Sequence, residues 1–170
     1  MINFGKLNIT KGLQEWIALH EVMAPKMLAV GIQFRFAIAN PAEDTLFLLI
    51  EMNGDIEEML NASNNPRAIE MRESAGVKVD TQEMISAIDS SVFWEKNVPN
   101  KSAKILGTLN VVGEFNIEDT AKYLNLSGSD KLIWSGYSSE ENKLYFLTET
   151  KSEAKKDYEL MSEIKAVYFP

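Results

Sequence analysis

Apolar and polar positions in the first part of the chain change their period at well-defined points, and each change marks a new element. Residues 2–9 alternate as a β-strand does, and the apolar positions that follow take helical spacing as far as Gly31. Thr10 is the expected N-cap of this helix. Pro25 is expected to kink the helix or restart it near Ala24, because proline lacks the backbone N–H that the helix needs.

The pattern that follows predicts a hairpin, a second helix with two caps and further strands. In chain order these are a strand over 32–39, a turn over 40–44, a strand over 46–50, a helix that begins at Asp55, is capped again at Asn65-Pro66 and stops at Gly76, a segment over 77–80 that leads into a strand over 83–88, and a segment over 92–94. The predicted order of residues 1–94 is therefore βαββαβ.

Residues 95–102 are polar and contain a proline, which is typical of a linker. Beyond them the same order recurs, with strands over 105–112, 132–137, 143–150 and 164–169, and helices from Asn116 and from Ser152 through Met161. The hairpin turns begin at residues 40 and 138, and the caps Asp55 and Ser152 follow them at nearly equal distances, which favours an internal duplication. We predict one unit over 1–94, a linker over 95–102 and a second unit over 103–170.

A βαββαβ unit has the ferredoxin-like arrangement, in which both helices cover one face of a four-stranded antiparallel sheet. The runs 46–50 and 144–147 are apolar at successive positions, which indicates strands that are covered on both faces. We therefore predict an α+β fold in which two ferredoxin-like units pack sheet to sheet, as an α+β barrel within one chain, with a cavity between the sheets.

Three short segments carry a resemblance to a known superfamily: Glu15-Trp16-Ile17, the run over 27–32, and Glu73-Ser74-Ala75-Gly76-Val77. Over about residues 1–90 the chain resembles the dimeric α+β barrel superfamily, most of all its short uncharacterised bacterial members, including a cyanobacterial family of unknown function. The resemblance implies a barrel that such proteins usually build by dimerising. It also implies a choice among cofactor-independent monooxygenases, lactone isomerases, haem-degrading enzymes and stress-responsive proteins, among which the fold alone does not decide.

Composition narrows the classes of partner. The chain has 25 Asp+Glu and 17 Lys+Arg, a formal net charge of −8, which disfavours nucleic acid because phosphate binding rests on Lys and Arg. The absence of cysteine excludes disulfides and thiolate sites. No secretory signal or run long enough for a membrane span is recognisable, so we expect a cytoplasmic protein that does not bind membranes.

The single histidine, His20, is the residue on which acid–base chemistry near neutral pH would depend. It lies on the apolar stripe of the first helix with Trp16. Three interpretations stay open: a partly buried histidine that donates to a carbonyl, a residue that faces a ligand, and an axial haem or metal ligand.

Further candidates for a ligand site are aromatic or cationic. Phe34 and Arg35 lie on a predicted strand, where Arg35 either meets an anionic ligand or is a surface charge, and Trp94 and Trp134 either wall a cavity or fill a core. Methionines such as Met71 suit an adaptable pocket, although core filling is the favoured interpretation.

No metal-binding spacing, nucleophile motif or phosphate loop occurs, and we expect no metal and no cofactor. The favoured function is binding of a small apolar or aromatic molecule between the sheets, by a monomer or a homodimer. The alternatives are a cofactor-independent monooxygenase or isomerase with His20 as base, and a non-catalytic interaction module with a solid interior; whether the protein is an enzyme stays open.

Overall fold

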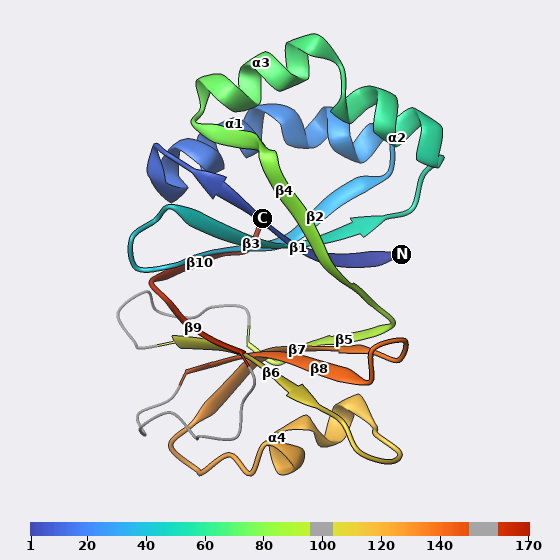
Figure 1. The fold of residues 1–170 in the computed structure, drawn as a ribbon, viewed down its shortest axis with the longest axis vertical. Helices are drawn as coiled ribbons and strands as arrows, with labels where there is room; N and C mark the ends of the chain where they lie inside the picture. Colours follow the sequence, from blue (N-terminus) through green and yellow to red (C-terminus); the bar gives the residue numbers. More distant parts are fainter. Residues whose placement is uncertain (96–103, 150–159) are drawn as a thin grey trace. The chain divides into compact units, whose positions relative to one another are not determined.

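The computed structural model describes residues 1–95, 104–149 and 160–170 (Figure 1). The chain divides into two compact units, Met1–Ala87 with Ala166–Pro170, and Ile88–Lys165. Each unit holds a five-stranded sheet together with helix, so the predicted α+β class is confirmed. The predicted linker over 95–102 lies, apart from Glu95, outside the described residues, as does most of the helix predicted from Ser152.

The first unit has the predicted βαββαβ order, with its second helical segment divided in two. Its elements are β1 (Ile2–Ile9), α1 (Gly12–Ala29), β2 (Ile32–Ala39), β3 (Thr45–Met52), α2 (Ile56–Ser63), α3 (Pro66–Ser74), β4 (Val77–Ile88) and β10 (Ala166–Tyr168). The strand order is β10-β2-β3-β1-β4, in which the last four strands follow the ferredoxin-like arrangement. Helices α1, α2 and α3 lie together over one face of this sheet (Figure 1).

Local sequence signals define α2 and α3 as predicted. The Asp55 side chain accepts a hydrogen bond from the Glu58 N–H at 3.0 Å, and the Asn65 side chain accepts one from the Arg67 N–H at 2.9 Å. These bonds satisfy N–H groups that have no partner within the helix. The left-handed φ of +84° at Gly76 then ends α3.

Two expectations for α1 need correction. The helix runs from Gly12 to Ala29 with Pro25 inside it, so the predicted restart near Ala24 is wrong, while the predicted kink stays a prediction. Thr10 is not the N-cap, because its hydroxyl donates to the Gly76 carbonyl at 3.2 Å, a partner distant in the sequence. The Glu43 carboxylate instead accepts the Leu13 N–H in the first turn, at 3.2 Å.

Alternation along the strands gives the first sheet an apolar face toward its helices. The buried cluster on this face consists of Leu7, Ile9, Leu13, Trp16, Ala37, Ala39, Leu46, Leu48 and Val77. Side chains from β1, β2, β3, β4 and α1 therefore share one core, as a sheet covered by helices requires.

The second unit repeats this plan with less helix among its described residues. Its elements are β5 (Ser90–Phe93), β6 (Lys104–Asn110), the 3₁₀ turn η1 (Ile117–Asp119), α4 (Thr120–Tyr123), β7 (Lys131–Ser138), β8 (Lys143–Glu149) and β9 (Leu160–Ile164), in the sheet order β5-β7-β8-β6-β9. The helix predicted through Met161 is wrong at its end, because β9 begins at Leu160. Asn116 accepts a hydrogen bond from the Glu118 N–H at 3.2 Å, which confirms the predicted cap.

The edge strands differ from the prediction in their partners. The last strand was expected in the sheet of the second unit, yet β10 pairs with β2, and β5, which overlaps the segment predicted over 92–94, pairs with β7. Apolar alternation reveals a strand but carries little information about which free edge it joins. For this reason the observed units differ from the ranges 1–94 and 103–170.

Both sheets have the same strand order, and their hairpins also share an irregularity. The β2–β3 ladder shifts register between Phe34 and Phe36, and the β7–β8 ladder shifts between Leu132 and Trp134. Each shift lies at the same distance before its hairpin turn. This agreement supports the predicted internal duplication, which stays a prediction.

Within the described parts of the chain, no helix combines the length and the apolar character needed to cross a bilayer.

Candidate functional site

A pocket of about 440 Å³ lies between the helices and the sheet of the first unit. Its size falls in the range of about 300–1,000 Å³ that is usual for small-molecule sites. The sequence predicted a cavity on the face of the sheet away from the helices, whereas this pocket is on the helix side, because α1 and the α2–α3 pair do not fill the space between them and the sheet.

Three groups of residues line the pocket. The sheet contributes Leu7, Ile32, Phe34, Leu48, Ile50, Met52, Val77 and Gln82. Helix α1 and its C-cap contribute Trp16, Leu19, His20, Met23, Lys26, Met27 and Val30. The α2–α3 segment contributes Ala62, Ser63, Asn65, Arg67, Ala68, Met71 and Arg72.

Regular geometry explains why these residues converge. Leu48 and Ile50 are two positions apart on β3 and therefore face the same side of the sheet. On α1, the positions Trp16, His20 and Met23 are separated by four and three residues, which places them on one stripe of the helix. The stripe predicted from the sequence is correct at its N-terminal end, but Leu28 is 61% exposed.

An aromatic cluster forms one wall of the pocket. The rings of Trp16 and His20 stack with centroids 5.3 Å apart, and both meet the edge or face of Phe34, at 5.5 and 5.2 Å. Tyr168 on β10 contacts both Trp16 and His20, at 6.3 and 5.9 Å. The structure thus brings together three residues that the sequence indicated as candidates, and it adds an aromatic residue from the far end of the chain.

His20 is buried, with 7% of its surface exposed, and its Nδ1 has no hydrogen-bond partner. Burial lowers the pKa of the imidazole, because the charged form is the more costly to desolvate, and the nearby Glu21 carboxylate opposes this shift only in part. The neutral form therefore predominates at pH 7. An imidazole in this state can accept a proton or a hydrogen bond from a molecule in the pocket.

Apart from His20, the polar part of the pocket lining comes mainly from cationic side chains. Arg72 donates from Nη2 to the Ser63 carbonyl oxygen at 2.6 Å, and from Nη1 to Gln82 Oε1 at 3.4 Å, while its Nε is buried without a partner. Burial lowers the pKa of the guanidinium, and Glu73 opposes this shift. Lys26 and Arg67 complete the set of cations on the lining.

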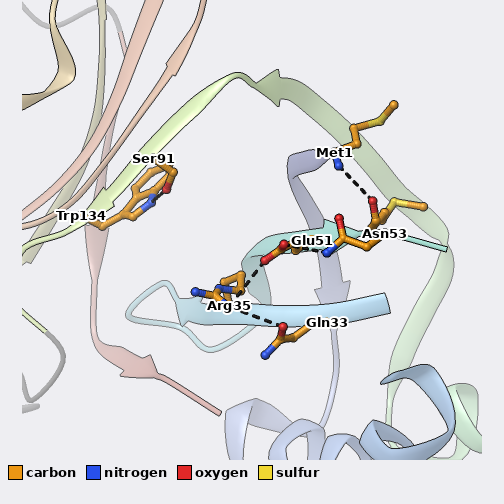
Figure 2. A network of polar contacts seen from close by, with 8 residues as sticks. Met1, Gln33, Arg35, Glu51, Asn53, Ser91 and Trp134 are labelled. Atoms are coloured by element: carbon orange, nitrogen blue, oxygen red, sulfur yellow. Dashed lines mark hydrogen bonds and ion pairs between the residues drawn. The ribbon is translucent and has the colours of Figure 1, made fainter. Parts of the chain in front are cut away.

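Arg35 does not line the pocket. Figure 2 shows its guanidinium beside two neighbours on the sheet: an ion pair joins Nη1 to Glu51 Oε2 at 3.5 Å, and Nη1 donates to Gln33 Oε1 at 3.4 Å. The residue lies at the register shift in β2, where the extra residue changes the side-chain direction. A role for Arg35 in binding an anion stays a prediction.

The two other tryptophan candidates belong to the second unit. Trp134 is completely buried, and its indole Nε1 donates to Ser91 Oγ at 2.8 Å (Figure 2). Trp94 donates from Nε1 to Ser135 Oγ at 3.0 Å and packs against the core of that unit. Neither lines the pocket of the first unit, and their proposed ligand contacts stay predictions.

Several residues of the pocket were missed by reasoning from the sequence. Met23, Met27 and Met71 were interpreted as core filling, and Arg67 and Arg72 were not considered. The available signal was the spacing on α3, where positions 67, 68, 71 and 72 share one face of the helix. Nothing in the sequence indicated that this face would meet α1 across an open space.

A second hollow of about 430 Å³ lies on the outside of α1 and α3, and it is lined largely by exposed residues, including Glu15 and Glu70. It lacks the aromatic wall and the sheet floor of the first. Among the described residues, no group of three or more His, Cys, Asp or Glu side chains is placed to hold a metal ion.

Comparison with known proteins yields distant likenesses. No protein-family model matches the chain, and no curated protein does either. A solved structure from Fusobacterium nucleatum subsp. nucleatum, described as a "putative monooxygenase", aligns over 99% of this chain and 93% of its own at 11% identity, with a TM-score of 0.47. One from Lactobacillus acidophilus with the same description aligns over 99% and 95% at 11% identity, with a TM-score of 0.45. At these identities and TM-scores, neither carries an inference about activity.

Proposed function

We propose that this protein binds a small apolar or aromatic molecule in the pocket between α1, the α2–α3 pair and the sheet of the first unit. The observation that carries the proposal is a pocket of about 440 Å³ whose lining is mostly aliphatic, aromatic and thioether side chains. An apolar lining of this extent costs stability, because its side chains stay in contact with water instead of being buried. A bound apolar molecule would cover that surface.

The composition of the walls supports an adaptable site. Met23, Met27, Met52 and Met71 contribute flexible, polarizable side chains that can adjust to an irregular ligand. The stacked pair of Trp16 and His20 offers a flat aromatic surface beside them. An aromatic ring packs favourably on such a wall, in an offset or edge-to-face arrangement.

The neutral dye N-phenyl-1-naphthylamine, which fluoresces in apolar surroundings, is a direct probe of this proposal. We expect saturable binding to the full chain, and loss of that binding in Ala68→Phe, because the added ring occupies the pocket from α3. The matched control Ala18→Phe places the same ring on an exposed position of α1 outside this pocket and should bind as the wild type does. Equal binding by both variants, or none by the wild type, would contradict the proposal.

A second candidate function, removal of a proton from the bound molecule, is favoured by the state of His20. Its imidazole is on the pocket wall, and burial lowers its pKa. A general base needs to be unprotonated at the working pH and within reach of the proton that it takes. An enzyme of isomerase type would use such a group in its first step.

Deuterium exchange tests the second candidate without knowledge of the natural substrate. The bicyclic ketone 2-tetralone has acidic C–H bonds beside its carbonyl, and their exchange in D₂O can be followed by NMR. We expect faster exchange with the wild type than with His20→Gln at equal concentration. Identical rates for the two proteins would count against His20 as a base, while leaving ligand binding intact.

A further inference from the structure

The pocket carries a charge opposite in sign to that of the whole protein. Across the chain, 25 acidic residues outnumber 17 basic ones. Among the described residues, the lining of the pocket includes Lys26, Arg67 and Arg72 but no Asp or Glu. A concave site with low-dielectric walls concentrates the field of such charges, and here the field attracts anions.

Arg72 is the most constrained of the three cations. Its two terminal nitrogens donate to the Ser63 carbonyl and to Gln82, and these two residues also line the pocket. The guanidinium has five N–H donors, and the bond to Gln82, at 3.4 Å, is long. Partial burial of this cation without a carboxylate partner on the lining is costly, and an anionic group on the ligand would offset that cost.

A purely structural role for Arg72 also has support. Ser63 is the last residue of α2, so the hydrogen bond from Nη2 satisfies a carbonyl at the end of that helix. This role accounts for the hydrogen bond that Nη2 of Arg72 donates. It does not explain why Lys26 on α1 and Arg67 on α3 border the same apolar space.

We propose that the molecule held in this pocket is amphipathic, with an apolar or aromatic body and a single carboxylate or other monoanionic group that Arg72, assisted by Lys26 and Arg67, recognises. This inference rests on the proposed binding function and adds the chemical class of the ligand. The body packs against the aromatic wall and the methionines, and the anion meets the guanidinium, whose planar fork matches a carboxylate.

A pair of fluorescent dyes separates the charge from the apolar body. 1-Anilinonaphthalene-8-sulfonate has the ring system of N-phenyl-1-naphthylamine with one sulfonate added. We expect Arg72→Gln to weaken binding of the sulfonate dye about tenfold, in line with the loss of one charge-assisted hydrogen bond, while affinity for the neutral dye changes little. Added salt should weaken only the sulfonate dye.

Matched variants make the result decisive. Lys78→Gln removes one positive charge from an exposed position that does not line the pocket and should leave both affinities unchanged. If Arg72→Gln does not fold, the double variant Lys26→Gln/Arg67→Gln takes its place, because these two side chains are exposed, and it should lower the preference for the sulfonate dye severalfold.

Each outcome has a separate meaning. Suppose that the neutral dye binds, and that the ratio of its affinity to that of the sulfonate dye is the same in the wild type as in the Arg72 and Lys26/Arg67 variants. This result would overturn the inference that the ligand is anionic and leave the proposed function standing. Failure of the neutral dye to bind the wild type would overturn the proposed function and this inference together. An effect of Lys78→Gln as large as that of Arg72→Gln would assign the preference to net charge and overturn the inference.

Discussion

Two neighbouring leucines on β3 allow a test of which face of the sheet holds the ligand. Leu48 and Leu49 are 3% and 0% exposed, and because side chains alternate along a strand they point to opposite faces. Leu48 lines the pocket on the helix side, and Leu49 does not. Replacing each by Ala removes the same three carbon atoms from the two faces.

Both substitutions should lower stability, Leu49→Ala more than Leu48→Ala, whereas Leu48→Ala should have the larger effect on binding. A buried Leu→Ala change lowers the free energy of unfolding by about 2–5 kcal/mol, and Leu49→Ala should be near the upper end because Leu49 does not border the pocket, whose open space allows packing to relax. At about 0.8 kcal/mol per methylene, the smaller side chain in Leu48→Ala weakens binding of N-phenyl-1-naphthylamine about 4- to 60-fold, depending on whether one or all three of the removed carbons touch the dye. Leu49→Ala should change the dissociation constant less than about twofold.

Fluorescence titration of both variants gives the dissociation constants, and urea denaturation followed by circular dichroism gives the stabilities. Circular dichroism before each titration also verifies that the variant is folded, because a loss of about 5 kcal/mol would unfold much of a domain at the lower end of the usual range of about 5–15 kcal/mol. The reasoning fails if Leu49→Ala weakens binding as much as Leu48→Ala does. A larger effect at Leu49 would place the ligand on the face that the sequence had predicted.

Three further predictions concern the same unit and a glycine of the second. Trp16→Ala should lower the free energy of unfolding by about 3–5 kcal/mol, because the indole is 4% exposed and packs against the rings of His20, Phe34 and Tyr168. A loss below about 1 kcal/mol in urea denaturation would contradict the place of this indole in the core. Since burial lowers the pKa of His20 below its unfolded value of 6.5, the unfolded chain takes up the proton first as the pH falls. Wild-type stability should therefore decline below about pH 6.5 relative to His20→Phe, by at most about 1.4 kcal/mol per pH unit, and parallel stability curves for the two proteins would refute the shift. Gly31→Ala should lower the free energy of unfolding by well over the roughly 1–2 kcal/mol of left-handed backbone strain, because its added Cβ would lie 2.4 Å from the Gly54 nitrogen. Gly113→Ala should cost only that strain, because Gly113 has φ +86° and open space around it. Equal melting temperatures for the two variants would contradict the close approach at Gly31.

The predictions that hold are those in which the signal and its physical cause lie within a few residues. The caps at Asp55 and Asn65 accept hydrogen bonds from N–H groups two or three residues ahead, and the glycine that ends α3 needs only its own backbone freedom. The same holds for the hairpin of β2 and β3, whose alternation and turn are adjacent in the chain. Elements of this kind can be recognised in any sequence.

Where several elements compete for the same partner, the predictions from the sequence are wrong or incomplete. Thr10 fits the N-cap of α1 by local rules, but both its hydroxyl and its backbone N–H donate to the carbonyl of Gly76, at 3.2 and 2.8 Å, which is distant in the sequence. The strands β5 and β10 are recognisable as strands, and only the assembled sheets decide which edge each of them joins.

The candidate site also combines features that the sequence predicted with features that only the tertiary structure decided. The sequence by itself determined the α+β class, most element boundaries and the aromatic stripe of α1 that carries Trp16 and His20. Tertiary structure alone placed Tyr168 against that stripe and Arg72 on the lining of the same pocket, and it left the space between the helices and the sheet unfilled. The physical reason is that helix and strand formation depends on neighbours along the chain, whereas a pocket depends on how closely finished elements can approach one another in space.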